Sequence, residues 1–302
     1  MDPVTLSWCA AAAAALLYGV GAVLQGIGAR TARPAPGVHA TFRRIVRQPK
    51  YLAGLSIDLL AWILTIAALQ QLPVFAVQTI VASSLAVTVV LAHFVHGATL
   101  RPIDVAAIVG TVTSLVLVGA AAGSEPPGSP STAVAVALTV GAPAVAVISL
   151  LTSSASSRVS STIAGTAFAG SMLAARATHF GDGLLASAIR PLSWAAIAYG
   201  LVGLVSYARA LEAGDVGSAT ASTWATEIVI ASLASRTILG DHARQGWQWV
   251  ATAGLALALL STFILARSNA RTTNSNDAKR GLPGPATTAL RSQSSAGPDS
   301  LC

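Results

Sequence analysis

Long apolar segments recur along the whole chain, separated by short polar ones. Each segment can cross the hydrocarbon core of a bilayer as a helix, at a rise of about 1.5 Å per residue. The pattern therefore predicts an all-α, polytopic membrane protein with about nine transmembrane helices. The expected spans are residues 4–29, 51–69, 73–95, 103–122, 131–151, 160–179, 193–211, 216–239 and 247–266.

Composition excludes an ordinary soluble domain. Hydrophobic residues make up 54% of the chain and charged residues only 10%, whereas a soluble domain has about 25% charged residues. The lipid bilayer of a cell (inner or plasma) membrane is thus the expected surrounding. The net charge of +7 comes from basic residues in one loop and in the tail, without interleaved aromatic residues. We interpret this charge as a signal of membrane orientation, and we expect no nucleic-acid partner.

The distribution of basic residues predicts the orientation. A basic loop follows the first span, and the positive-inside rule places it in the cytoplasm and the N-terminus outside. Nine crossings then put the C-terminus in the cytoplasm. The tail, residues 267–302, has too little apolar surface to fold and is predicted to be disordered. The basic residues of the loop are Arg30, Arg33, Arg43, Arg44, Arg47 and Lys50.

An internal repeat organises the expected transmembrane domain, residues 1–266. The segment AALQQLPVFAV (67–77) aligns with RALEAGDVGSA (209–219), and VHGATLRPID aligns with ILGDHARQGW. Repeat one then covers residues 1–122 (helices 1–4) and repeat two covers residues 160–266 (helices 6–9), with a linking helix over 131–151. Because one odd helix separates them, the repeats have opposite orientations. Inverted repeats are typical of secondary transporters, with a site near the midplane between them.

Two acidic residues, Asp58 and Glu227, fall inside expected spans. Acidic groups at such depth are costly and usually functional. Thr220, Thr223 and Glu227 have the spacing i, i+3, i+7, which places them on one helical face. We interpret Glu227 as a protonatable group lining a pathway and Asp58 as a proton or cation site. The structural alternatives are helix–helix contacts for Glu227 and an interfacial arginine partner for Asp58.

Three further polar residues are candidates for the same pathway. Gln25 and Arg176 occupy similar positions in the first and sixth spans, and Gln78 belongs to a polar stripe in the third. Arg176 could bind an anionic group, pair with an acid, or extend its side chain to the interface. Gln78 could line a cavity or hydrogen-bond a neighbouring helix. His93 and His96 have a spacing suited to one metal but lack a third ligand nearby, so any metal remains unknown.

Two stretches resemble a known family. Ala210-Leu211, the turn at 239–241, Trp247 and Gly254 resemble the end of an EamA-type repeat of the drug/metabolite transporter superfamily. The stretch GLSIDLLAWILTIAALQQLPVFAV (54–77) is similar to the second and third helices of its NIPA-like branch, whose members are described as magnesium transporters. The resemblance implies two inverted repeats and transport of a divalent cation. The acid expected in the second helix falls on Trp62, one turn beyond Asp58.

Taken together, the sequence predicts a secondary transporter that moves a small solute or cation by alternating access. In the more specific version of this prediction, the transported ion is magnesium or another divalent cation. A proton-coupled exporter of small metabolites or drugs and a non-transporting membrane scaffold remain as alternatives. No enzyme signature or phosphate-binding glycine loop is present, so we expect neither catalysis nor a cofactor. A homodimer is left open. The expected pathway residues are Asp58, Glu227, Thr223, Thr220, Gln78, Gln25, Arg176 and Trp62.

The orientation can be tested by labelling cysteines introduced into two loops of intact cells. We expect residues 30–50 to be labelled only from the cytoplasmic side, because that loop is rich in Arg and Lys. We expect residues 123–130, which contain no Arg or Lys, to be labelled from outside. Labelling of 30–50 by an impermeant reagent added outside would contradict the predicted orientation.

Overall fold

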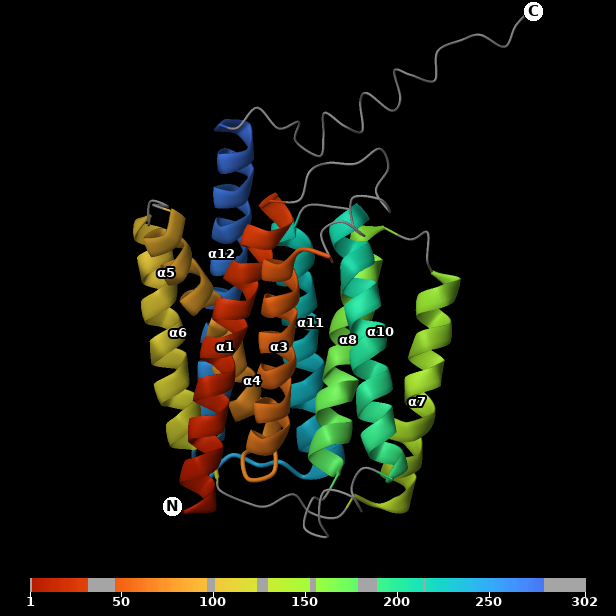
Figure 1. The fold of residues 1–302 in the computed structure, drawn as a ribbon. Helices are drawn as coiled ribbons and strands as arrows, with labels where there is room; N and C mark the ends of the chain where they lie inside the picture. The colour runs from red at the N-terminus through yellow and green to blue at the C-terminus, as the bar shows by residue number, and fades with distance from the viewer. Residues whose placement is uncertain are drawn as a thin grey trace, which may run out of the picture.

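The computed structural model describes residues 2–31, 47–96, 101–123, 130–152, 156–178, 189–213 and 216–279. The helices run roughly side by side and form one elongated bundle (Figure 1). Within the described residues all regular structure is helical, apart from an isolated antiparallel bridge between Ala122 and Ala243. The helices are α1 (Pro3–Thr31), α3 (Pro49–Ala68), α4 (Val74–Ala82), α5 (Ser84–His96), α6 (Pro102–Ala121), α7 (Thr132–Leu151), α8 (Ser157–Ala177), α10 (Pro191–Ala213), α11 (Val216–Ala234), the π-helical η1 (Ser235–Leu239) and α12 (Gln248–Lys279).

The expected all-α architecture is confirmed, and the apolar helices are compatible with a multi-pass membrane protein. In the described part of the chain, seven helical segments are long and apolar enough to cross a membrane. They are α1, α3, the combined segment Val74–Phe94, α6, α7, α10 and the apolar part of α12. This count is lower than the nine spans expected, because α8 and α11 are not among the seven.

The two helices missing from that count are rich in Ser, Thr, Gly and Ala and lie inside the bundle. Most of α8 between Ser160 and Ala177 is buried, and α11 packs against α8, α12 and α4. A helix whose neighbours are other helices does not need large apolar side chains on every face. The peripheral helices do expose such side chains, for example Leu59, Val112, Val140 and Leu201.

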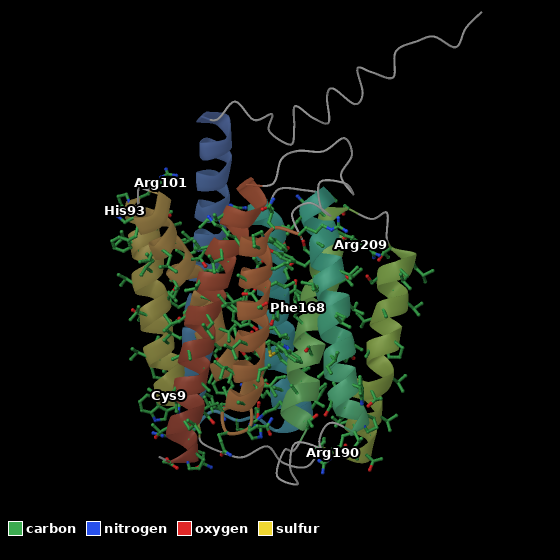
Figure 2. All side chains as sticks on the ribbon, viewed as in Figure 1. Cys9, His93, Arg101, Phe168, Arg190 and Arg209 are labelled. Atoms are coloured by element: carbon green, nitrogen blue, oxygen red, sulfur yellow. The ribbon has the colours of Figure 1, made fainter. Side chains whose placement is uncertain are left out.

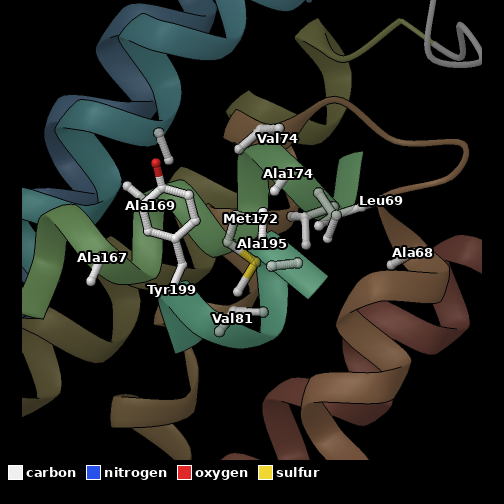
Figure 3. Close-up of a cluster of buried hydrophobic side chains, with 14 of the residues drawn as sticks. Ala68, Leu69, Val74, Val81, Ala167, Ala169, Met172, Ala174, Ala195 and Tyr199 are labelled. Carbon is white, nitrogen blue, oxygen red and sulfur yellow. The ribbon is translucent and has the colours of Figure 1, made fainter. Parts of the chain in front are cut away.

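The bundle contains close helix pairs, among them α1 with α3 and α8 with α10. Glycines let the first pair approach closely: a Cβ atom on Gly54 would lie 2.7 Å from the Gly21 carbonyl oxygen. In the second pair, the ring of Tyr199 packs on Gly170. Figure 3 shows Tyr199 beside Met172 in the largest apolar cluster, to which α3, α4, α8 and α10 contribute most residues and α1, α7 and α11 one each.

The third expected span consists of two helices that meet at Ser83, a residue with right-handed helical backbone angles. α4 ends at Ala82 and α5 begins at Ser84. The Ser83 N–H donates to Thr79 and Ile80 carbonyl oxygens, and its hydroxyl donates to Ile80 O at 2.6 Å. A serine that bonds back to its own helix in this way bends it. α4 is therefore a nine-residue half-helix that begins at one end of the bundle and stops near its middle.

The bundle has two distinguishable ends. We call the end at which α1 begins the N-terminal end, and the other the opposite end. The α3–α4 turn, the last turn of α8 and the segment before α12 all lie at the N-terminal end (Figure 1). There Gly240, with φ of 70° in the left-handed region, terminates η1 and leads into Asp241.

Some expectations concern residues that the structure does not describe. Residues 32–46 of the basic loop, 124–129 of the expected external loop and 280–302 of the tail lie outside the described residues, as does the side chain of His96. The beginning of the tail differs from the expectation of disorder, since α12 continues as a helix to Lys279.

The α1–α3 contact can be tested with two alanine substitutions. Gly54→Ala places a methyl group against the Gly21 carbonyl and Gln25, so the helices must separate. We expect a loss of about 1–3 kcal/mol in unfolding free energy. Gly26→Ala on α1 is the matched control, because no atom lies within 4 Å of its added Cβ. Thermal unfolding in detergent measures both, and equal midpoints would contradict the close contact.

Candidate functional site

A buried ion pair joins α8 to the segment that precedes α12. Arg176 Nη2 and Nε donate to Asp241 Oδ1 at 3.0 and 3.3 Å. The two side chains are only 2% and 5% exposed. The interface-extended conformation considered for Arg176 is therefore wrong, and its pairing with an acid is what the structure shows.

The ion pair also binds the ends of two helices. Arg176 Nη1 donates to the carbonyl oxygen of Leu69, the C-cap of α3. Asp241 Oδ2 accepts from the N–H of Val74, the first residue of α4, at 2.9 Å. Helix C-termini carry partial negative charge and N-termini partial positive charge. Each member of the pair thus faces the helix end of opposite sign, which compensates both charges inside the bundle.

A second polar contact lies one turn further along α4. Gln78 Nε2 donates to Glu227 Oε1 at 3.0 Å, and both side chains are buried. Gln78 Oε1 is also buried and has no hydrogen-bond partner. Among the described residues, no cationic side chain pairs with Glu227. A carboxylate in such a place lacks charge compensation, which favours its binding a proton or a cation.

A third polar contact joins α1 and α3. Gln25 Nε2 donates to Asp58 Oδ2. The other oxygen, Asp58 Oδ1, is buried without a hydrogen-bond partner and packs on Gly21. In the described part of the chain no arginine pairs with Asp58, so the interfacial-arginine alternative finds no support there. Both candidate acids therefore have a neutral amide as their partner.

Tyr18 on α1 contacts the helix that carries Asp58. Its hydroxyl is hydrogen-bonded to Thr65 on α3. Asp58 and Thr65 are seven residues apart and so occupy the same face of α3. Sequence reasoning missed Tyr18 and Thr65, although this seven-residue spacing was a signal for Thr65.

The remaining predicted residues do not gather at Glu227. The Thr220 hydroxyl bonds Tyr207 on α10 at 2.7 Å, and Thr223 Oγ1 donates to Ser161 O on α8 at 3.4 Å. Glu227 instead faces α4, so the threonines act as helix–helix contacts in this structure. Trp62 is half-buried on α3 and makes no hydrogen bond to these polar groups among the described residues.

The structure brings no obvious metal centre together. In the described part of the chain, no three side chains of His, Cys, Asp or Glu lie close enough to hold a metal ion. His93, Arg101 and Arg209 lie at the opposite end of the bundle, and Arg190 lies at the N-terminal end (Figure 2).

Comparisons with family models, with curated proteins and with solved structures find no match to this chain.

Exchanging the two charges tests whether the helix ends matter to the ion pair. Asp241→Asn should lower the unfolding free energy by about 3–5 kcal/mol, because it leaves Arg176 buried and uncompensated. The double variant Arg176→Asp/Asp241→Arg restores a pair of opposite charges but places each against the wrong helix end. We expect this exchange not to restore the thermal unfolding midpoint. Full recovery would contradict the role assigned to Leu69 O and Val74 N–H.

Proposed function

We propose that this chain is a multi-pass secondary transporter that moves a small solute or cation by alternating access. The observation that carries the proposal is a pair of carboxyl groups, half-buried Asp58 and buried Glu227, each with an amide partner and, among the described residues, no cationic one. A carboxylate that is buried without a counter-charge tends to acquire a proton or a cation. A coupling or substrate site must bind and release such a proton or cation reversibly.

Helix packing supports the further proposal of two inverted repeats. α1 packs on α3 and on α5, and α8 packs in the same way on α10 and α11. The last helices of the two proposed repeats, α6 and α12, pack on each other. The linking helix α7 packs on α8 and α10. A two-fold relation between helices 1–4 and 6–9 produces this pattern. It requires α8 and α11 to cross the membrane as well, giving nine crossings.

The half-helix α4 supports a site at the centre of the bundle. In many transporters, substrates bind where a transmembrane helix is interrupted near the midplane. α4 ends at Ala82, and it carries Gln78, which is hydrogen-bonded to Glu227. The proposed site therefore contains Glu227 and Gln78 between the two repeats, and Asp58 with Gln25 forms a second polar contact between α1 and α3.

The unpaired oxygens favour a cationic substrate or coupling ion. Asp58 Oδ1 and Gln78 Oε1 are both buried acceptors without donors. Carboxylate and amide oxygens are suitable ligands for magnesium and other hard divalent cations. The more specific version of the proposal is therefore that the transported ion is magnesium or another divalent cation. The second candidate, proton coupling, is favoured by the same Gln78 oxygen, since protonated Glu227 could donate a hydrogen bond to it.

Orientation completes the proposal. Figure 2 shows Arg101 and Arg209 at the opposite end of the bundle and Arg190 at the N-terminal end, and Arg47 and Lys50 flank the start of α3 at that same opposite end. Under the positive-inside rule this distribution favours a cytoplasmic location for that end, with the N-terminus outside. The chain would then reside in the cell membrane and contact lipid through its peripheral helices.

The proposal is tested by flux into proteoliposomes. We expect uptake or release of a divalent cation or, with a proton gradient, of a small metabolite from a substrate panel. Glu227→Gln should abolish this flux because it removes the charge that binds the cation or proton. The variant should fold normally, since its amide nitrogen can donate to the unpaired Gln78 Oε1 and add about 1 kcal/mol of stability.

Thr223→Val is the matched control on α11, and we expect it to weaken transport far less than Glu227→Gln. Normal flux by Glu227→Gln would make Glu227 a packing residue and leave Asp58 as the coupling group. Absence of flux across the whole panel, from protein that is correctly folded, would favour the scaffold alternative.

A further inference from the structure

The buried ion pair lies on the seam between the two halves of the chain. Arg176 and Asp241 belong to the second half, whereas Leu69 and Val74 belong to the first. All four residues lie at the N-terminal end of the bundle. The halves cannot separate at this end unless Arg176 releases Leu69 O and Asp241 releases the Val74 N–H.

The half-helix α4 is attached to the second half at two points. Asp241 holds its first N–H, and Glu227 holds Gln78, one turn later. At Ser83 it meets α5. Because α4 is a single short rigid element, movement at one attachment displaces the other.

We infer that Arg176 and Asp241 form a latch that closes the N-terminal end of the bundle, and that α4 couples this latch to the occupancy of Glu227. The inference rests on the proposed transport function for its biological meaning. Its physical content is a link between two contacts on one helix: a proton or cation that displaces Gln78 from Glu227 loosens α4 and so weakens the hold of Asp241 on Val74.

The two repeats differ in their capacity to form such a latch. In the sequence alignment of the repeats, the position equivalent to Asp241 is Ala98, which cannot supply a carboxylate. The ion pair therefore has no counterpart at that aligned position, and the inferred latch belongs to the N-terminal end.

Cysteine accessibility tests the latch without any assay of transport. Ala231 is fully buried on α11, one turn beyond Glu227 on the side of the latch, in the same apolar cluster as Leu69 and Val74. Ala219 is buried on α11 on the other side of Glu227. Each is replaced by cysteine in a chain with Cys9→Ser and Cys302→Ser, and its rate of modification by a charged, water-soluble thiol reagent is measured on purified protein.

We expect Asp241→Asn to accelerate modification at position 231 by at least about tenfold, because the open population rises when the latch is lost. Modification at position 219 should stay the same or slow down. Arg244→Gln is the matched control, since it removes an exposed charge three residues away and should leave both rates unchanged. Equal rates at position 231 with and without Asp241→Asn, or equal acceleration at both positions, would overturn the latch.

A milder variant keeps the test valid if Asp241→Asn fails to fold. Arg176→Lys retains the charge but loses the planar fork that reaches Asp241 and Leu69 O together. We expect an intermediate acceleration at position 231. A folded Arg176→Lys protein with the wild-type rate would overturn the inference.

A double-mutant cycle tests the coupling through α4. Gln78→Met removes the bond to Glu227 while keeping a similar side-chain volume. If α4 links the two contacts, either single change already releases α4. The cysteine introduced at position 231 in the combined Asp241→Asn/Gln78→Met variant should then be modified more slowly than multiplying the accelerations of the two single variants predicts. Accelerations that simply multiply would show independent contacts and contradict the coupling.

These outcomes are separate from those of the flux assay. Acceleration at position 231 without any transported solute would leave the latch standing and the transport proposal wrong. Transport without acceleration would leave the transport proposal standing and the latch wrong.

Discussion

The structure depends on one electrostatic constraint: a guanidinium and a carboxylate are buried together at the meeting point of two helix ends. Neither charge could stay inside an apolar bundle alone. Their placement satisfies the terminal carbonyl of α3 and the first N–H of α4, two groups that a turn in a membrane-spanning domain must otherwise leave without partners. The α3–α4 turn, the end of α8 and the Gly240-Asp241 turn are held in position by the same four bonded groups.

Further inside, the polar chemistry changes character. Asp58 and Glu227 are each held by the amide of a glutamine rather than by a cation, and each contact leaves one buried oxygen unpaired. An amide positions a carboxyl group without neutralising it. Arginine compensates charge where the chain must be held, and glutamine leaves charge uncompensated where a ligand could bind. This contrast between the two kinds of contact separates the structural part of the interior from the part we propose to be functional.

Sequence periodicity predicted the extent of most helices closely, because apolar stretches and flanking prolines define them locally. It also identified Asp58, Glu227, Gln25, Gln78 and Arg176 as interior polar residues. It could not predict which residue each of them would bond, because a stripe of polar residues identifies one face of a helix but not the neighbouring helix that packs on that face. Thr220 and Thr223 share a stripe with Glu227 and yet bond α10 and α8. The Ser83 break and the partnership of Arg176 with Asp241, 65 residues away, depend on tertiary contacts that no local pattern contains.

The low hydropathy of α8 has a consequence for how the protein is made. If α8 crosses the bilayer, as proposed, its own sequence does not provide enough apolar surface for stable insertion, and it carries Arg176 with it. The compensating carboxylate of Asp241 is synthesised 65 residues later. During biosynthesis α8 would then depend on the insertion machinery, or on its earlier neighbours α3 and α7, until α11 and the turn after it emerge. The last third of the chain thus determines whether the middle third stays in the membrane, and truncation before Asp241 should leave α8 without a stable place in the bilayer.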